Sequence, residues 1–354
     1  MKLFNGNITK GRPAILTYST SLDTISLHTA VLAYTLLIII MPAFCSCEES
    51  TPENTENVRT FNVHESYAVG NSGSLDIFFF NDDNLRLLDS YQRLYSIPSD
   101  YIEASSRAGD KILFAIAGSS MDPGAIGRYD DLNGVSANLR EENPESPVMT
   151  ACTAVRAGNG SITARLEPLL SEITVNSICC DFHKKPYAGQ KLEDVRIYLT
   201  NARDMYPVSG EGPAGGSFVN CGRLSEDDMK DPVLAGLLQA SLEEDLGDNV
   251  VHPGIHLYCY PNKAEEESLG TPFTRLVIEG TLGGEKTYYP ITISPDPEPS
   301  GGSRGVGRNK SYAFDITICR RGVPSPDIPI EVGTVRCGFR VKEWKVMDER
   351  TIGF

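Results

Sequence analysis

The alternation of apolar and polar residues in short segments is the feature that most limits how this chain can fold. It is clearest over residues 312–319 and 335–342, and it recurs over residues 195–199. Successive side chains of a β-strand point to opposite faces, so such a segment places one side chain in a core and the next in solvent. Residues 112–117 are apolar on both faces, which is typical of a central strand. The pattern predicts a chain built mainly from strands.

Two pairs of these segments are expected to form hairpins. Residues 75–80 and 85–95 flank an Asn-Asp-Asp-Asn turn, and residues 276–281 and 286–293 flank a Leu-Gly-Gly turn. Short turns of these compositions commonly connect antiparallel strands. In the last alternating segment of the chain, the side chains expected to face a core are Val335, Cys337, Phe339 and Val341.

A single helix is expected between two sequence signals. Asp231 is a suitable N-cap, Pro232 suits the first turn, and Gly247 suits a C-terminal end. The apolar residues at helical spacing between them are Val233, Leu234, Leu237, Leu238 and Leu242. We expect this stripe to pack on a sheet, with binding of a partner as the alternative.

Many short strands with few helices favour β-sandwiches. The chain has 354 residues, and the part after an N-terminal export signal has the length of two sandwiches. Residues 201–217 are rich in Gly and Pro, so we predict an N-terminal sandwich over 59–205 and a C-terminal sandwich over 206–354. A second Pro/Gly-rich loop, 295–308, is expected to interrupt the C-terminal domain.

The N-terminus carries an export pattern. The apolar run 30–44 has fifteen residues, which suits a signal peptide and is short for a membrane span. Because Ser46 is small and Phe44 is bulky, the site resembles a bacterial lipoprotein signal with Cys47 as the lipidated residue and Cys45 as the alternative. We therefore predict a lipoprotein signal peptide over 1–47. A plain signal peptide and an N-terminal anchor helix remain open.

The residues on either side of this run add two details. Glu48 and Glu49 resemble the surface-export signal of Bacteroidetes lipoproteins, and residues 48–58 are expected to be a flexible tether because they are polar and lack aromatic residues. The basic residues of the leader lie far before the apolar run, which fits a true start codon further downstream or an unusual export region.

The charge and motifs of the chain argue against catalysis. Lys and Arg number 32 against 47 Asp and Glu, a net charge of -15, so binding of nucleic acid is not expected. His252 and His256 have helical metal-pair spacing, but Pro253 and Gly254 separate them. No nucleophile triad, phosphate loop or calcium loop is complete in the sequence. We expect no enzyme activity, no cofactor and no metal site.

The remaining cysteines and paired tyrosines have simple interpretations. Seven cysteines follow the signal, an odd number without zinc-site spacing, and several occupy apolar strand positions, which predicts buried thiols for Cys259, Cys319 and Cys337. A redox pair of Cys179 and Cys180 is the alternative.

The tyrosine pairs 258/260 and 288/289 are expected to place one ring in a core and one at its rim, with an aromatic sugar platform as the alternative.

Several segments in order along residues 58–346 resemble the fimbrillin superfamily, the subunits of Bacteroidales-type (type V) pili. They are LDIFFFNDDNLRLLDSYQRL (75–94), ITARLEPLLSEITVNSI (162–178), DVRIYLTN (194–201), HLYCYPNKAEEESLGTPFTRLVIEGTL (256–282), YYPITI (288–293), NKSYAFDITICRRG (309–322) and VRCGFRVKEWKV (335–346). The first and fourth of these look most like the anchor and accessory-subunit branch.

This resemblance implies two tandem transthyretin-like β-sandwiches, an outer-membrane lipoprotein precursor and other fimbrial subunits as partners. In polymerising subunits, an arginine-specific protease removes the first strand, and a C-terminal strand of a neighbour fills the groove. An anchor subunit instead keeps its first strand and its lipid.

Applied to this chain, the resemblance makes the Arg59–Thr60 bond the candidate cleavage site, because Arg59 is the only basic residue between the tether and the expected first strand. Residues 335–354 are the candidate donor strand. The last eight residues, MDERTIGF, form a short charged tail, whereas a polymerising subunit should offer a longer tail of alternating apolar residues. This favours an anchor or terminal subunit over a shaft subunit. The alternative is a surface lipoprotein that binds a host glycan or protein.

Overall fold

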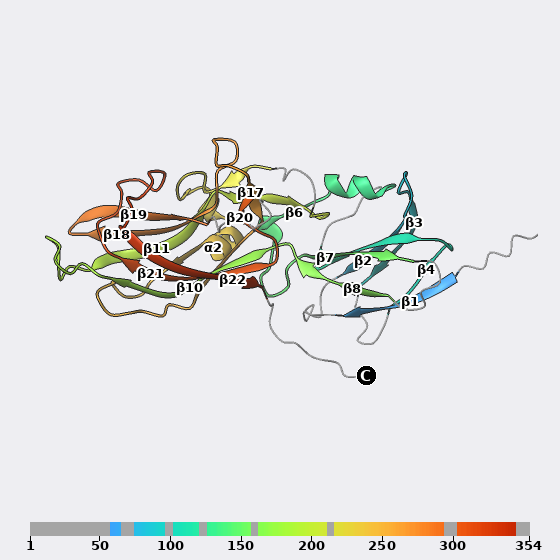
Figure 1. Cartoon of the computed structure of the whole chain (residues 1–354), viewed down its shortest axis with the longest axis horizontal. Coiled ribbons are helices and arrows are strands. Elements are labelled where there is room, and N and C mark those ends of the chain that lie inside the picture. The colour runs from blue at the N-terminus through green and yellow to red at the C-terminus, as the bar shows by residue number, and fades with distance from the viewer. Residues whose placement is uncertain are drawn as a thin grey trace, which may run out of the picture. The chain divides into compact units, whose positions relative to one another are not determined.

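The computed structural model describes residues 57–64, 74–95, 102–119, 126–156, 162–210, 216–293 and 303–344. These residues form an all-β fold, as the sequence predicts (Figure 1). Within them, the one α-helix is α2, Pro232–Leu238, and the 3-10 helices are η2, Tyr129–Gly134, η3, Leu139–Glu141, and η4, Asp228–Lys230. No helix in the described part of the chain is long and apolar enough to span a membrane.

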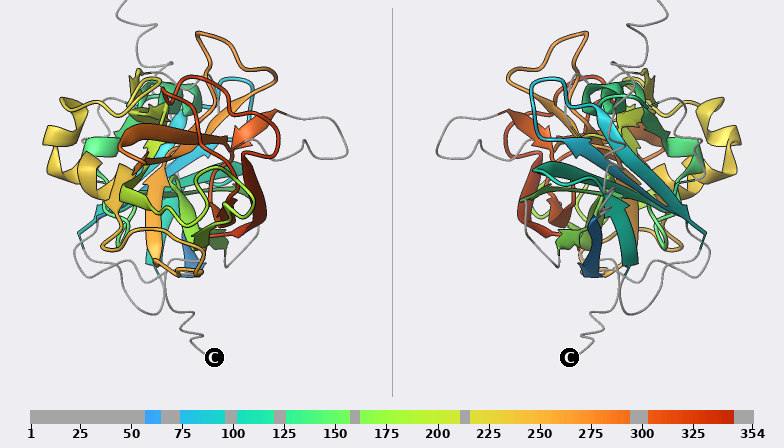
Figure 2. Two further views of the ribbon diagram at one scale, coloured as in Figure 1. Left: turned by 90° about the vertical axis from the view of Figure 1, so that its left-hand side faces the viewer. Right: turned by 90° about the vertical axis from the view of Figure 1, so that its right-hand side faces the viewer.

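The first sandwich is built from a five-stranded and a three-stranded sheet. In sheet order, the larger consists of β3, Leu88–Leu94, β2, Leu75–Asn81, β5, Lys111–Ala117, β7, Met149–Val155, and β9, Glu167–Pro168. The smaller consists of β4, Ile102–Ser106, β1, Asn57–His64, and β8, Thr163–Arg165. Figure 2 (right) looks onto the end with these N-terminal strands. Both sheets contribute to one core, in which Phe79, Leu113 and Ile102 are at most 2% exposed.

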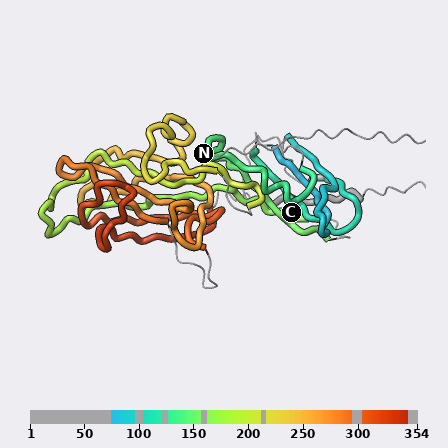
Figure 3. Tube along the Cα trace, turned by 90° about the horizontal axis from the view of Figure 1, so that it is seen from above, coloured from blue at the N-terminus to red at the C-terminus, as the bar shows by residue number. Residues whose placement is uncertain are grey.

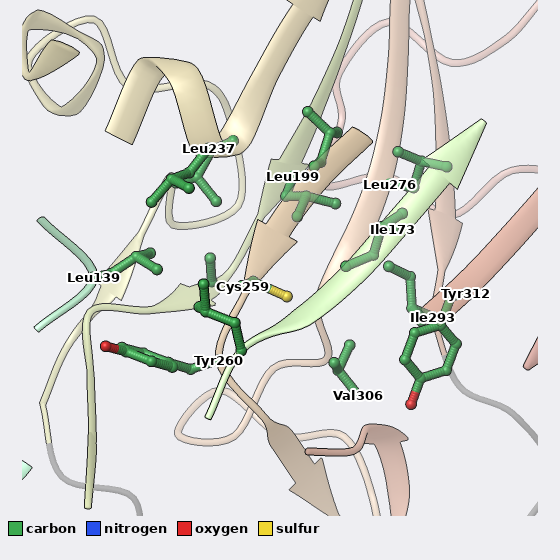
Figure 4. Close-up of a cluster of buried hydrophobic side chains, with 14 of the residues drawn as sticks. Leu139, Ile173, Leu199, Leu237, Cys259, Tyr260, Leu276, Ile293, Val306 and Tyr312 are labelled. Carbon is green, nitrogen blue, oxygen red and sulfur yellow. The ribbon is translucent and has the colours of Figure 1, made fainter. Parts of the chain in front are cut away.

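The second sandwich is built from two four-stranded sheets. In sheet order, one consists of β16, Ile255–Cys259, β10, Ser171–Cys180, β21, Lys310–Ile318, and β22, Val335–Glu343. The other consists of β15, Gln239–Ser241, β11, Leu192–Thr200, β18, Arg275–Leu282, and β19, Glu285–Thr292. The core between them includes Ile173, Leu199, Leu276 and Tyr312 (Figure 4).

Three further two-stranded pairs complete the described structure. They are β12, Ala202–Arg203, with β14, Phe218–Val219; β13, Met205–Pro207, with β6, Ser136–Asn138; and β17, Asn262–Ala264, with β20, Arg304–Val306. The β6–β13 pair joins segments that precede and follow the two long strands β10 and β11.

Both predicted hairpins are confirmed. β2 and β3 pair antiparallel across the polar turn, and β18 and β19 pair antiparallel across Gly283 and Gly284. Both glycines have positive φ angles, 62° and 83°, which glycine adopts without steric cost.

Sheet membership changes between Pro168 and Ser171, earlier than the predicted boundary at residue 205. β10 pairs with β16 and β21, and β11 pairs with β15 and β18. Figure 3 shows these yellow-green strands among the orange and red C-terminal ones. A division at residue 205 would cut through both four-stranded sheets, whereas a division near Leu169 and Leu170 keeps both sandwiches whole.

The predicted helix begins where expected but ends early. The Asp231 carboxylate accepts hydrogen bonds from the backbone N–H groups of Val233 and Leu234, as an N-cap does. The helix ends at Leu238 and not at Gly247, because the next three residues form β15 against β11. Leu234, Leu237 and Leu238 are buried, so the expected packing of the stripe is confirmed.

The expected burial of the inner side of β22 is wrong. β22 is an edge strand that pairs with β21 in the described structure, and Phe339 and Val341 are 45% and 42% exposed. Phe339 stacks on buried Phe314, but Cys337 is exposed. The alternation of β22 is therefore real, but nothing in its sequence tells whether another layer covers it.

Candidate functional site

The first strand, β1, connects the two other strands of its sheet. Its residues Asn57–Phe61 pair antiparallel with β4, and Asn62–His64 pair parallel with β8. The backbone groups of β4 and β8 that face β1 thus depend on it for their hydrogen bonds. A strand in this position is the element whose removal or exchange changes the sheet most, because unpaired backbone groups are costly when they are buried.

The Arg59–Thr60 bond lies inside β1 and not ahead of it. The strand begins at Asn57, and Arg59 and Thr60 pair with Ala104 and Glu103 of β4. β1 therefore includes the last two residues of the predicted tether. Cleavage after Arg59 would cut the strand and leave Thr60–His64 attached to the rest of the chain. Whether the bond is cut stays a prediction.

The other export-related residues lie outside the described residues. These are the signal peptide 1–47 with Cys45 and Cys47, the tether up to residue 56, and the last ten residues of the candidate donor strand.

One arginine makes several hydrogen bonds between the two sandwiches. Arg308 lies between β20 and β21, and its guanidinium reaches β7 and β9 of the first sandwich. Nε donates to the Pro168 carbonyl at 3.1 Å, and Nη2 donates to the Glu167 carbonyl at 2.7 Å and to the Thr150 carbonyl and hydroxyl at 3.1 and 2.8 Å. Burial lowers the pKa of Arg308 from its ordinary value. The carbonyl oxygens replace the water that this cation loses.

A buried carboxyl group forms a second polar contact between the two sandwiches. Glu142, just after η3, accepts a hydrogen bond from the hydroxyl of Tyr260 at 2.8 Å and one from the Val148 N–H at 3.1 Å. Both Glu142 and Tyr260 are buried, and Tyr260 stacks on Tyr206. Figure 4 shows Tyr260 in the same cluster as Leu139 of η3. Burial raises the pKa of Glu142 to about 7, against the opposing effect of its two hydrogen bonds.

The predicted cysteine and tyrosine positions are partly confirmed. Cys259 is buried as expected, Cys319 is half-buried and Cys337 is exposed. All seven described cysteines are free thiols. Tyr260 and Tyr289 are fully buried, whereas their neighbours Tyr258 and Tyr288 are half-buried, which is the expected arrangement of one core ring and one rim ring.

The two histidines of the rejected metal pair have other partners. His256 lies on β16, and its Nδ1 is 2.8 Å from Glu172 Oε1. His252 Nδ1 is 2.8 Å from the Asn176 carbonyl oxygen. Among the described residues, no group of three potential metal ligands gathers.

Sequence reasoning missed Arg308 and Glu142. Arg308 lies in a segment that reads as a Gly-rich loop, and Glu142 lies in the polar run Arg-Glu-Glu-Asn. Arg308 bonds Thr150 and Glu142 bonds Tyr260, and each of these pairs is more than 100 residues apart in the chain, so no local pattern indicates them.

No family model and no curated protein sequence matches this chain. Solved structures do match it. A proposed cell adhesion protein from Parabacteroides distasonis has 16% identity and a TM-score of 0.57, over 82% of this chain and 93% of that chain. A similar protein from Bacteroides eggerthii has 14% identity and a TM-score of 0.56, over 81% and 95%.

A fimbrilin from Porphyromonas gingivalis has 12% identity and a TM-score of 0.59, over 82% of this chain and 98% of that chain. The chain thus covers nearly the whole of each of these structures. At these low identities, the matches show a shared fold. The chain has the fold of a fimbrilin from Porphyromonas gingivalis and of proposed adhesion proteins from Parabacteroides and Bacteroides.

Proposed function

We propose that the protein is a structural subunit of a cell-surface fimbria, joined to other subunits by β-strand addition. The observation that carries the proposal is the position of β1 between β4 and β8. A strand from a neighbouring subunit could take that position and satisfy the same backbone groups, with its alternate side chains facing the core. The fold shared with a fimbrilin supports the same role.

Within a fimbria, we place the protein at the base or at an end. β22 pairs with β21 over nine residues in unbroken register, so the first part of the candidate donor segment is already the last strand of its own sheet. A shaft subunit needs a long free strand to donate, and the first nine residues of this segment are already paired with β21. An anchor that keeps β1 and carries lipid on Cys47 fits these features. Its location would be the outer membrane and cell surface.

Lipid anchoring gives the first prediction. Replacing Cys47 with alanine removes the sulfur that carries the lipid, so the variant is expected in the soluble fraction while the natural protein stays with the outer membrane. Cell fractionation and immunoblotting measure this. Cys45→Ala is the matched control and should leave the protein on the membrane. Unchanged membrane association of Cys47→Ala would contradict the lipid site, and release of Cys45→Ala alone would move it to Cys45.

The second candidate is a surface lipoprotein that binds a host glycan or protein. It is favoured by the half-buried rings of Tyr258 and Tyr288 and by the likeness to proposed adhesion proteins. Tyr289 is buried, so an effect of its removal on binding would not separate ligand contact from folding. A glycan array with the natural protein and Tyr288→Ala tests this candidate, which fails when neither protein binds.

A further inference from the structure

Three polar side chains meet in the five-stranded sheet of the first sandwich, where β2 ends and β5 begins. Lys111 Nζ lies 2.5 Å from Asn81 Oδ1 and 3.3 Å from Asp89 Oδ2. The side chains of Lys111 and Asp89 are each only 3% exposed. Burying an ammonium group and a carboxylate costs free energy, because both groups lose their contacts with water. Their presence together in a buried position therefore points to a function.

The strands hold these groups in place. Asn81 is the last residue of β2, Lys111 is the first residue of β5, and the two residues are paired in the antiparallel register. The next pair along is also fixed: the Asp82 N–H donates to the Asp110 carbonyl, and Arg156 bonds both of their carboxylates. The Lys111 amine and the Asn81 amide are therefore held against each other by the sheet itself.

Asp89 reaches Lys111 because β3 has an irregularity at that point. Phe79 pairs with Ser90 and Phe80 pairs with Leu88, so Asp89 is an extra residue in the ladder. Such a bulge redirects a side chain, and bulges are common beside active sites. The Arg107 N–H donates to Asp89 Oδ2 at 2.8 Å, and the Arg107 guanidinium lies 3.9 Å from Asp89 Oδ1.

We propose that Lys111 and Asn81 form an intramolecular isopeptide bond, with Asp89 as the proton carrier. An amide C=O bond is about 1.23 Å long, so Asn81 Cγ lies within about 3.7 Å of Lys111 Nζ, close to the distance of a reacting pair. The site resembles catalytic arrangements in which a buried amine is activated by a neighbouring acid–base group.

The reaction balances without an added reagent. Lys111 gives one ammonium proton to Asp89, and the lone pair of the neutral Nζ attacks Asn81 Cγ. Asp89 delivers this first proton to Asn81 Nδ2, and the tetrahedral intermediate collapses as the Cγ–Nδ2 bond breaks. Asp89 takes the second Nζ proton and passes it to the departing ammonia, which leaves as ammonium, so Asp89 ends as the carboxylate that it was at the start. The product is a Cγ–Nζ amide that ties β2 to β5.

Mass spectrometry of the intact, folded protein tests the proposal. The natural protein is expected to be lighter than its sequence by one ammonia molecule, and tryptic digestion should yield a branched peptide that joins Asn81 to Lys111. Asp89→Asn keeps the shape of the side chain but cannot carry the proton, so it should lose the branched peptide. Lys111→Arg keeps the positive charge and should lose it as well.

Two outcomes would overturn the proposal. One is a natural protein that is folded by circular dichroism but keeps its full mass after prolonged incubation. The other is an ammonia loss that persists in Lys111→Arg, because that result indicates a succinimide at Asn81 and not a cross-link. Glu141→Gln, at an exposed position away from the three residues, is the control and should keep the branched peptide. None of these results depends on whether the protein enters a fimbria.

Discussion

Replacing Arg308 with alanine is expected to lower the free energy of unfolding by about 3 to 5 kcal/mol, since hydrogen bonds to a charged group each contribute about 1.5 to 3 kcal/mol and buried acceptors are left unpaired. The guanidinium bonds the Thr150, Glu167 and Pro168 carbonyls together, and these lie on β7 and β9. Without it, the contact between the two sandwiches loses four hydrogen bonds.

Urea unfolding followed by circular dichroism measures this effect. Arg308→Lys should recover only part of the stability, because an ammonium group cannot match the planar set of donors that reaches three carbonyls. Arg304→Ala removes an exposed arginine four residues earlier and should change stability by less than about 0.5 kcal/mol. Equal losses from Arg304→Ala and Arg308→Ala would refute the role given to Arg308.

Replacing Glu142 with glutamine is expected to stabilise the protein at neutral and alkaline pH. Its pKa is about 7 in the folded protein and about 4.5 when exposed, so the folded state favours the protonated form. This group supports folding fully below pH 4.5, and its contribution is lost as the pH rises through 7. A shift of this size corresponds to about 3 kcal/mol at high pH.

The measurement is the free energy of unfolding of both proteins between pH 4.5 and 8.5. The advantage of Glu142→Gln should be near zero at the acidic end and grow to about 3 kcal/mol at the alkaline end, since the amide has no charge to bury. Glu141→Gln, which changes an exposed neighbour, should show no such trend. A constant difference at all pH values would show that Glu142 is not the titrating group.

The sequence predicts the strands well because the evidence for a strand is local. Alternation and turn composition lie within ten or so residues, and both hairpins follow from them. Tyr198 shows the limit of this reasoning. Its place in the alternation indicates an outward side chain, yet it is fully buried and its hydroxyl donates to Glu279 at 3.2 Å. Alternation gives the face of a side chain but not what covers that face.

The division between the sandwiches could not be read from the sequence for a related reason. Gly and Pro mark a change of chain direction, and the chain does reverse here, since β12 pairs antiparallel with β14. The point at which the chain passes from one sandwich to the other, however, depends on which strands pair with β10 and β11. Those strands, β21 and β18, lie later in the chain. The same holds for Asp89, whose contact with Lys111 follows from a bulge that no composition signal marks.

Mass spectrometry of fimbriae that are extracted from the native cells with detergent, so that their membrane-bound bases stay attached, tests the central claim most directly. The proposed role predicts that this chain is recovered with the fibres, with β1 retained and an N-terminus at a lipid-modified Cys47. A chain that begins at Thr60 would also support a fibre subunit, but one that polymerises and does not anchor. Absence of the chain from fibres purified in this way, when the same detergent extract contains it as a separate protein, would contradict a fimbrial role.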